Sequence, residues 1–108
     1  MFNPMVEYTS EIDRVFHSLA DPVRRDILLR VAQSEHSVGE LVAYYDISFA
    51  AISKHLMVLE DACLIRKRKD GRKRMISLNR GALEVADQYL LTIVASISRL
   101  RNRRILKP

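Results

Sequence analysis

Ser53, Lys54 and His55 are neighbours in the stretch "SFAAISKHL" (residues 48–56), and these three residue types could act together as nucleophile, base and acid. The stretch has the character of a helix, in which successive side chains point about 100° apart, so the three cannot converge on one substrate atom. The sequence also contains no Gly-rich phosphate loop, no nucleophile elbow and no carboxylate pair at a suggestive spacing. We therefore expect no enzymatic activity.

The candidate metal ligands are scattered. None of His17, His36 and His55 has a second ligand three or four residues further along its own helix. We expect His17 on the flank of a helix, His36 in a polar turn and His55 partly buried. Cys63 is the only cysteine, which excludes an intrachain disulfide and a cage of thiolates. The sequence thus predicts neither a metal site nor another cofactor.

The positive charge of the chain is concentrated in one short segment. Residues 1–63 hold five Lys and Arg against ten Asp and Glu, residues 64–80 hold eight against one, and residues 81–108 hold five against two. The net charge is therefore −5, +7 and +3 in these segments, although the whole chain carries only +5. Such a block is expected where one face of a protein meets a polyanion. A solvated basic loop is the alternative that composition leaves open.

Two helices are predicted in the first third of the chain. An apolar stripe with helical spacing runs through residues 10–20, and Asp21 with Pro22 then ends this helix and starts a second one. Asp is a favoured N-cap, and Pro fits the first position of a helix. The second helix is expected to end near Gln33.

Residues 37–61 have the pattern of a helix-turn-helix. Ser37 and Glu40 have the spacing of a capping box at the start of a short helix, and Ser48 caps a longer helix after the turn "YYDI" (residues 44–47). The longer helix has one apolar stripe, formed by Ile52, Leu56 and Leu59. Two helices joined by a short turn are the basis of many DNA-binding domains.

A β-hairpin is predicted over residues 64–78. Asp70 and Gly71 form a strong turn signal between "LIRKRK" and "RMISL". We expect Ile65, Ile76 and Leu78 to face the core and the basic residues to face outward. The predicted fold is therefore mainly α with a small two-stranded hairpin, which is a single winged helix-turn-helix domain of about five helices over residues 1–108.

The side of the longer helix opposite its buried stripe is expected to contact DNA. Small residues near the start of the helix would let it enter the major groove, where side chains can bond base edges or phosphates. On this side lie Phe49, Ala50, Ser53, Lys54 and Met57. The wing would follow the adjacent backbone or minor groove. Its candidate contacts are Arg68, Lys69, Arg72, Lys73 and Arg74.

The first and last helices are expected to pair with those of a second copy of the chain. The last helix, over residues 81–100, has an apolar stripe too long to be covered by so small a core. The predicted dimer contacts are Ile12, Val15, Phe16, Leu19, Leu83, Ala86, Leu90, Ile93, Val94 and Ile97. Packing of the last helix on its own domain is the alternative. The basic tail, residues 101–108, could extend this helix, clamp DNA or be disordered, and disorder is the expectation for its final residues.

Four motifs in order resemble the ArsR family of winged-helix bacterial transcription regulators. They are "LADPVRR", "SVGEL", "ISKHLMVLEDACLI" and "KDGRKRMISL", and the resemblance covers roughly residues 12–100. It implies a homodimeric repressor that binds an imperfect palindrome, with its two modules in successive major grooves. It also adds Ser48 and His55 to the expected recognition-helix positions.

Several positions depart from the family pattern. Many members bind metal through a Cys-x-Cys pair in the third helix, where this chain has "VGELVAY". Others use Asp and His on the last helix, where Asp87 stands near the Asp position but Tyr89 takes the place of the His. Neither metal site can be carried over. Phe49 and Met57 replace residues that are often polar and basic, so base preference cannot be transferred. Cys63 stands where glycine is common, and a left-handed backbone there would cost roughly 1 kcal/mol.

We therefore predict a homodimeric DNA-binding regulator, most simply a repressor of a palindromic operator on double-stranded DNA, without a metal cofactor and with an unknown effector. The alternatives are a metal- or ligand-responsive sensor of the same fold and a winged-helix module that binds protein. The longest apolar-rich run, Tyr89–Ile97, is about half of what a membrane span needs, and the N-terminus has no signal-peptide pattern. The expected location is the cytoplasm, with no membrane partner.

Overall fold

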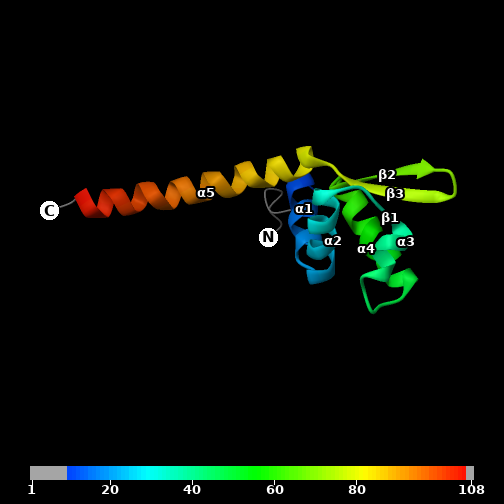
Figure 1. Ribbon diagram of the computed structural model, residues 1–108. Coiled ribbons are helices and arrows are strands. Elements are labelled where there is room, and N and C mark those ends of the chain that lie inside the picture. The colour runs from blue at the N-terminus through cyan, green and yellow to red at the C-terminus, as the bar shows by residue number, and fades with distance from the viewer. Residues whose placement is uncertain (1–9, 107–108) are drawn as a thin grey trace, which may run out of the picture.

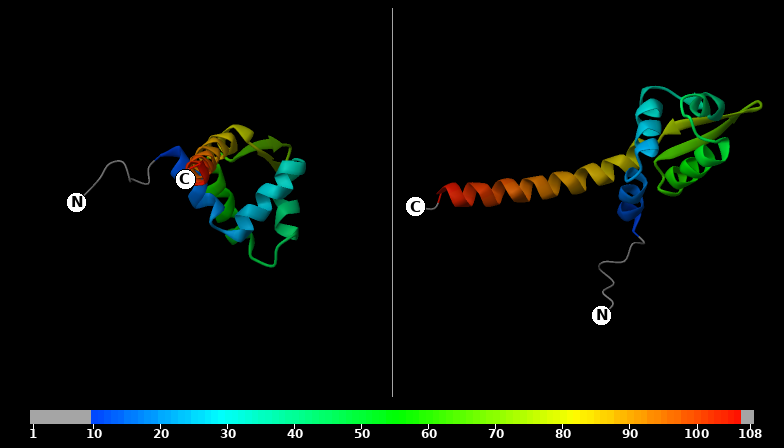
Figure 2. Two further views of the ribbon diagram at one scale, coloured as in Figure 1. Left: turned by 90° about the vertical axis from the view of Figure 1, so that its left-hand side faces the viewer. Right: turned by 90° about the horizontal axis from the view of Figure 1, so that it is seen from below.

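The computed structural model describes residues 10–106 and consists of a helical body, a β-hairpin that extends from it and one long helix that leaves it (Figures 1 and 2). The elements are α1 (Glu11–Leu19), α2 (Pro22–Gln33), β1 (His36–Ser37), α3 (Val38–Ala43), α4 (Phe49–Asp61), β2 (Ile65–Asp70), β3 (Lys73–Leu78) and α5 (Arg80–Leu106). The predicted winged helix-turn-helix is confirmed, with five helices in the described part of the chain.

The start of α2 is fixed by one carboxylate. Asp21 Oδ1 accepts hydrogen bonds from the backbone N–H of Val23 at 2.8 Å and of Arg24 at 3.1 Å, and Pro22 occupies the first helical position. These N–H groups would otherwise have no partner in the first turn. Burial alone would raise the pKa of Asp21, but the N–H groups and the nearby positive charge outweigh burial and lower the pKa. The predicted start and the predicted end at Gln33 are both confirmed.

The helix-turn-helix forms as its capping signals predict. Ser37 Oγ accepts from the N–H of Glu40 at 3.1 Å, and the Glu40 carboxylate accepts from the N–H of Ser37 at 3.1 Å. Ser48 caps α4 by accepting from Ala51 N–H at 3.1 Å. Helices α1 to α4 and the sheet enclose one core, whose fully buried members include Ile27, Leu41, Ile52, Leu56, Leu59, Leu64 and Ile76.

The wing is part of a three-stranded sheet, so the prediction of a two-stranded hairpin is incomplete. The strand order is β1-β3-β2, and both pairings are antiparallel. His36, which we expected in a polar turn, lies in β1 opposite Ile76, with Ser37 opposite Met75. A strand of two residues shows no alternation in the sequence, and its pairing is set by a strand almost forty residues away.

Helix α5 is longer than predicted. It spans Arg80–Leu106, or 27 residues, so the predicted end at residue 100 is wrong. The stretch beyond residue 100 contains no Gly or Pro before Pro108, and Arg and Leu favour helix, so nothing stops the helix earlier. The final two residues, 107–108, lie outside the described residues. Near its start α5 packs on α1, where the rings of Phe16 and Tyr89 meet edge to face at 6.0 Å.

No helix within residues 10–106 combines the length and the apolar character needed to cross a bilayer.

Helix α4 ends at a residue with left-handed backbone. Cys63 has a φ of 60°, and its N–H donates to the carbonyl of Glu60 at 2.9 Å while Leu64 N–H donates to that of Leu59 at 3.0 Å. Asn79 Nδ2 also donates to the Cys63 carbonyl at 2.7 Å. The left-handed backbone that we considered at Cys63 from the sequence is therefore present. Because Cys63 has a Cβ atom, this backbone conformation is strained.

We expect Cys63→Gly to stabilise the protein relative to Cys63→Ala. Both variants remove the thiol, but only glycine removes the Cβ that makes a positive φ unfavourable. The free energy of unfolding, measured by urea denaturation, should be higher for the glycine variant by roughly 1 kcal/mol. Equal stability of the two variants would mean that the backbone here is not strained.

We expect Asp21→Ala to lower the free energy of unfolding by about 0.5–2 kcal/mol at pH 7, because α2 loses its cap. Since folding lowers the pKa of Asp21, the contribution of this carboxylate is complete above the unfolded pKa of about 4 and is lost as pH falls through the folded value. Urea denaturation at pH 7 and pH 3 should show the difference between wild type and variant shrinking. Asp46→Ala, at an exposed turn position, serves as the control.

Candidate nucleic-acid interface

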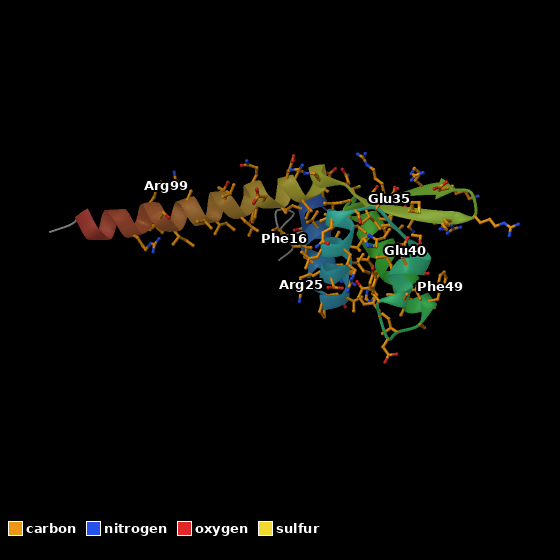
Figure 3. All side chains as sticks on the ribbon, in the orientation of Figure 1. Phe16, Arg25, Glu35, Glu40, Phe49 and Arg99 are labelled. Carbon is orange, nitrogen blue, oxygen red and sulfur yellow. The ribbon has the colours of Figure 1, made fainter. Side chains whose placement is uncertain are left out.

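Helix α4 presents two contrasting faces. Ile52, Leu56 and Leu59 are buried, as predicted. Phe49 and Met57, by contrast, are 62% and 58% exposed. Figure 3 shows Phe49 pointing away from α1 and α2, on the side to which the hairpin extends. The exposure of large apolar side chains at a helix surface marks a candidate contact site.

The turn before α4 is held to α2 by Tyr45. Its hydroxyl donates to Asp26 Oδ2 at 2.7 Å, and Arg30 Nε donates to the same carboxylate at 3.0 Å. Burial of the phenol, together with its bond to Asp26, raises the pKa of Tyr45 to about 12. The Arg30 guanidinium also lies over the ring of Tyr44, 3.7 Å from its centroid. These contacts fix the position from which α4 begins.

The register of the hairpin divides the basic residues between two faces. Lys67 is opposite Ile76 and Lys69 is opposite Arg74, so all of these share a face with the buried Ile65. Arg66, Arg68 and Lys73 belong to the other face. The expectation that Ile65, Ile76 and Leu78 face the core and the basic residues face outward is confirmed, because Ile65 and Ile76 are buried, Leu78 packs against the core, and the basic residues of both strands are exposed. The hairpin extends past the core, and both of its faces carry charge.

A groove lies between the exposed face of α4 and the wing. Its volume is about 590 Å³, and the start of α3 closes one side. The lining residues are Ser37, Val38 and Gly39 before and within α3, Phe49, Ser53, Leu56 and Met57 on α4, and Lys67, Arg72, Lys73 and Arg74 on the wing. The groove thus combines apolar and hydroxyl groups on one wall with four cations on the other.

Six of the predicted DNA contacts line this groove, namely Phe49, Ser53, Met57, Arg72, Lys73 and Arg74. Ser48, Ala50 and Lys54 are exposed at or near the start of α4, and Ser53 is half-buried. Lys69 is exposed on the groove face of β2. Sequence reasoning missed Lys67, although its spacing of two residues from the apolar Ile65 was a usable signal.

His55 and Arg68 lie elsewhere. The half-buried His55 ring lies against the start of α2, where Arg24 Nη1 donates to its Nδ1 at 3.3 Å. Arg68 pairs with Glu35 through Nη2–Oε1 at 2.5 Å and Nε–Oε2 at 3.3 Å. The hydrogen bond and the charge of Glu35 raise the pKa of Arg68. Neither side chain lines the groove.

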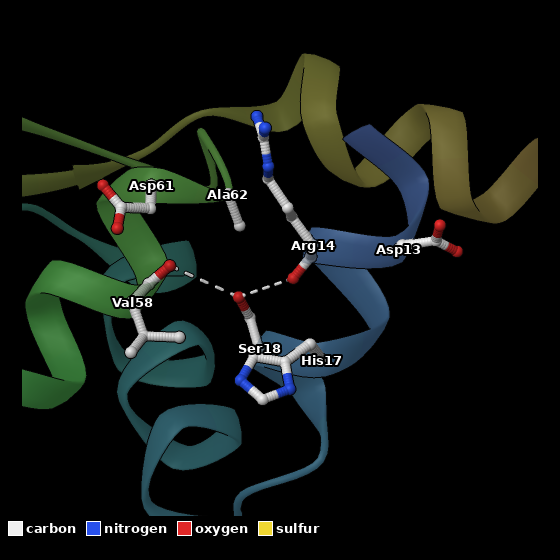
Figure 4. A pocket seen from close by; sticks show the side chains of 7 residues that line it. All are labelled: Asp13, Arg14, His17, Ser18, Val58, Asp61 and Ala62. Atoms are coloured by element: carbon white, nitrogen blue, oxygen red, sulfur yellow. Dashed lines mark hydrogen bonds between the residues drawn. The ribbon is translucent and has the colours of Figure 1, made fainter. Parts of the chain in front are cut away.

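A second hollow, of about 450 Å³, lies between α1 and α4 (Figure 4). It is lined by Asp13, Arg14, His17, Ser18, Val58, Asp61 and Ala62. The buried hydroxyl of Ser18 donates to the Arg14 carbonyl at 2.9 Å and lies 3.4 Å from that of Val58. The first contact lies within α1 and the second joins α1 to α4, so the hydroxyl serves the packing of these two helices. Among the described residues, no group of three or more His, Cys, Asp and Glu could hold a metal ion.

The predicted dimer contacts divide according to burial. Val15 and Ala86 belong to the core of this chain, and Ile12, Phe16, Leu19 and Leu83 are half-buried beside it. The exposed members lie further along α5. They are Leu90, Ile93, Val94 and Ile97, with exposed fractions between 42% and 57%.

The family model "Bacterial regulatory protein, arsR family" matches residues 21–67, which include the helix-turn-helix and the start of the wing. The chain is 40% identical over 67 residues to the HTH-type transcriptional regulator Rv2034 of Mycobacterium tuberculosis. That match covers 62% of this chain and 63% of that relative.

Two further similarities extend over more of the fold. The chain is 31% identical over 80 residues to the arsenical resistance operon repressor of Staphylococcus xylosus, covering 74% of this chain and 77% of that protein. The crystal structure of the ArsR family transcriptional regulator RHA00566 superposes with a TM-score of 0.78 and 28% identity, over 85% of this chain and 95% of that one. These proteins are regulators, not enzymes, and the chain belongs to the ArsR family of bacterial transcriptional regulators.

Proposed function

We propose that this protein is a homodimeric repressor that binds a palindromic DNA operator without a metal cofactor. The observation that carries the proposal is the groove, because it places the exposed face of α4 beside four cations of the wing. Phosphate contacts supply most of the affinity of such proteins, and contacts to base edges supply the specificity. Both kinds of group are present on facing walls.

The α4 wall is the proposed reader of the base sequence. The Ser53 hydroxyl can bond a base edge, and Phe49 can press on a thymine methyl group. Lys54 can reach a guanine edge or a phosphate. Between Phe49 and Ser53 the helix carries the small Ala50 and Ala51, while Ile52 is buried in the core, which allows the backbone to approach the DNA closely.

The exposed stripe of α5 is the proposed dimer contact. Within this exposed part of the helix, Leu90 and Ile97 are seven residues apart, and the same spacing relates Ile93 and Leu100. A seven-residue repeat of apolar pairs is the pattern by which two helices pack along their length. In a homodimer the same stripe serves both copies. Two domains joined in this way would reach successive major grooves on one side of the duplex.

The proposal includes no metal because the two motifs by which relatives hold one are not present in this chain. The third helix reads "VGELVAY" and Cys63 is the only cysteine. A metal- or ligand-responsive sensor of the same fold would be distinguished by titration, because its DNA affinity would change when the metal or ligand is added.

A salt series on DNA binding tests the proposed interface. For the promoter of the protein's own gene, the logarithm of the binding affinity should fall linearly with the logarithm of the salt concentration. Arg74→Ala should reduce the slope of this line by about 0.9, because one phosphate contact is lost.

Ser53→Ala should instead change the preference among DNA sequences, by about 1–3 kcal/mol if the Ser53 hydroxyl bonds a base. Arg25→Ala, an equal loss of charge on the exposed surface of α2, is the control for Arg74→Ala (Figure 3). A response to salt that is flat would exclude DNA as the partner and favour a protein partner.

Ile97→Asp should disrupt the dimer. Burying an apolar side chain of this size contributes about 1.5–3 kcal/mol, and each copy would instead bury a charge. The dissociation constant of the dimer should therefore rise roughly 100-fold or more. Sedimentation equilibrium measures the change. Gln88→Asp introduces the same charge on α5 away from the seven-residue repeat and should leave association nearly unchanged. If the wild type is a monomer at all concentrations, the proposed pairing is wrong.

A further inference from the structure

Lys67, which lines the groove, is paired with an acidic residue of α4. Its Nζ lies 3.3 Å from Oε1 of Glu60, and this contact joins the wing to the last turn of the reading helix. The side chain of Lys67 is 26% exposed and that of Glu60 46% exposed. Of the four cations on the wing wall of the groove, Lys67 therefore already has a partner in the free protein.

Glu60 lies on the same face of α4 as two residues that line the groove. Ser53, Met57 and Glu60 are separated by four and then three residues, which places them in one row along the helix. Glu60 does not line the groove itself, but its carboxylate contacts Lys67, so a negative charge lies beside one of the four cations of the groove. A phosphate that approached Lys67 would meet this carboxylate.

Little free energy is needed for Lys67 to exchange Glu60 for a DNA phosphate as its partner. An exposed ion pair contributes about 0.2–1 kcal/mol, while a phosphate contact also releases counterions from DNA. Lys67 can therefore leave Glu60 when DNA is present. The carboxylate that remains is unpaired beside a polyanion, and its repulsion lowers affinity for every sequence by a similar factor.

A second acidic residue that is paired with a cation of the wing provides a contrast. Glu35 contacts Arg68 with both carboxylate oxygens, and Arg68 lies on the face of the hairpin opposite Lys67. Glu35 immediately precedes β1, so this pair ties the hairpin to the edge of the sheet (Figure 3). Removal of the Glu35 charge would leave Arg68 without this partner, and Arg68 lies outside the groove.

We propose that Glu60 is a built-in competitor of DNA phosphate for Lys67, which holds down affinity for DNA of any sequence. The inference rests on the proposed function, since it needs DNA in the groove. In this arrangement the contacts made by Ser53 and its neighbours supply a larger share of the total affinity for the operator. Glu60 leaves the ratio of operator affinity to affinity for other DNA unchanged, but it makes binding of any strength depend more on base contacts.

The test compares Glu60→Gln with Glu35→Gln in the full chain. Each variant removes one negative charge from a residue paired with a wing cation, so net charge changes equally. The probe is a mixed-sequence duplex of about 30 base pairs, long enough for two half-sites one helical turn apart. Glu60→Gln should raise affinity about 2- to 5-fold and steepen the salt slope by up to about 0.9. Glu35→Gln should leave the slope unchanged and leave affinity equal or lower.

A double variant identifies the cation concerned. In the background of Lys67→Gln, the change Glu60→Gln should no longer steepen the salt slope. The inference is overturned if Glu60→Gln leaves affinity and slope at wild-type values, if Glu35→Gln raises them equally, or if the gain persists without Lys67. Failure of the wild type to bind the duplex with any salt dependence would instead overturn the proposed function. Thermal unfolding of each variant checks that the fold is retained.

Discussion

The rotation of α4 about its own axis determines which residues this protein can offer to DNA. Three apolar side chains, Ile52, Leu56 and Leu59, are buried along one line of the helix and leave almost no freedom for it to turn. Because side chains on opposite sides of a helix are fixed relative to each other, burying these three necessarily exposes Phe49 and Met57. The wing, the turn and the helix caps then determine where this exposed face of α4 lies, but not which residues it contains.

A single guanidinium connects three helices behind this face. Arg24 Nε donates to the carbonyl of Ser18 at 2.7 Å and Nη2 to that of His17 at 3.2 Å, at the C-terminal end of α1, while Nη1 contacts His55 on α4. Since α1 also packs on α5, the contacts form a continuous path from the long helix to the reading helix. A change in the angle between two paired copies could therefore reach α4 through packed groups, without passing through the exposed surface.

Features encoded by a few neighbouring residues were predictable from the sequence, and those set by distant contacts were not. The caps at Asp21, Ser37 and Ser48 follow from residues within three positions of one another, and the buried stripe of α4 follows from helical spacing alone. Strand β1 depends on β3, and the end of α5 was placed near residue 100 although no helix-breaking residue stands between there and Leu106. At the site, the wing cations were identified as a group, but which of them line the groove depends on the register of the hairpin and on two acidic residues from other elements.

The contact between Arg24 and His55 also selects between the two neutral tautomers of the imidazole ring. Two groups lie near Nδ1, with Arg24 Nη1 at 3.3 Å and Asp21 Oδ1 at 3.9 Å. A guanidinium can only donate, so its contact favours the neutral tautomer that has the lone pair on Nδ1 and the proton on Nε2. The ring nitrogen engaged by α2 is then an acceptor, and the nitrogen left over is a donor. The link that joins α2 to α4 therefore also gives the two edges of the His55 ring different hydrogen-bonding character.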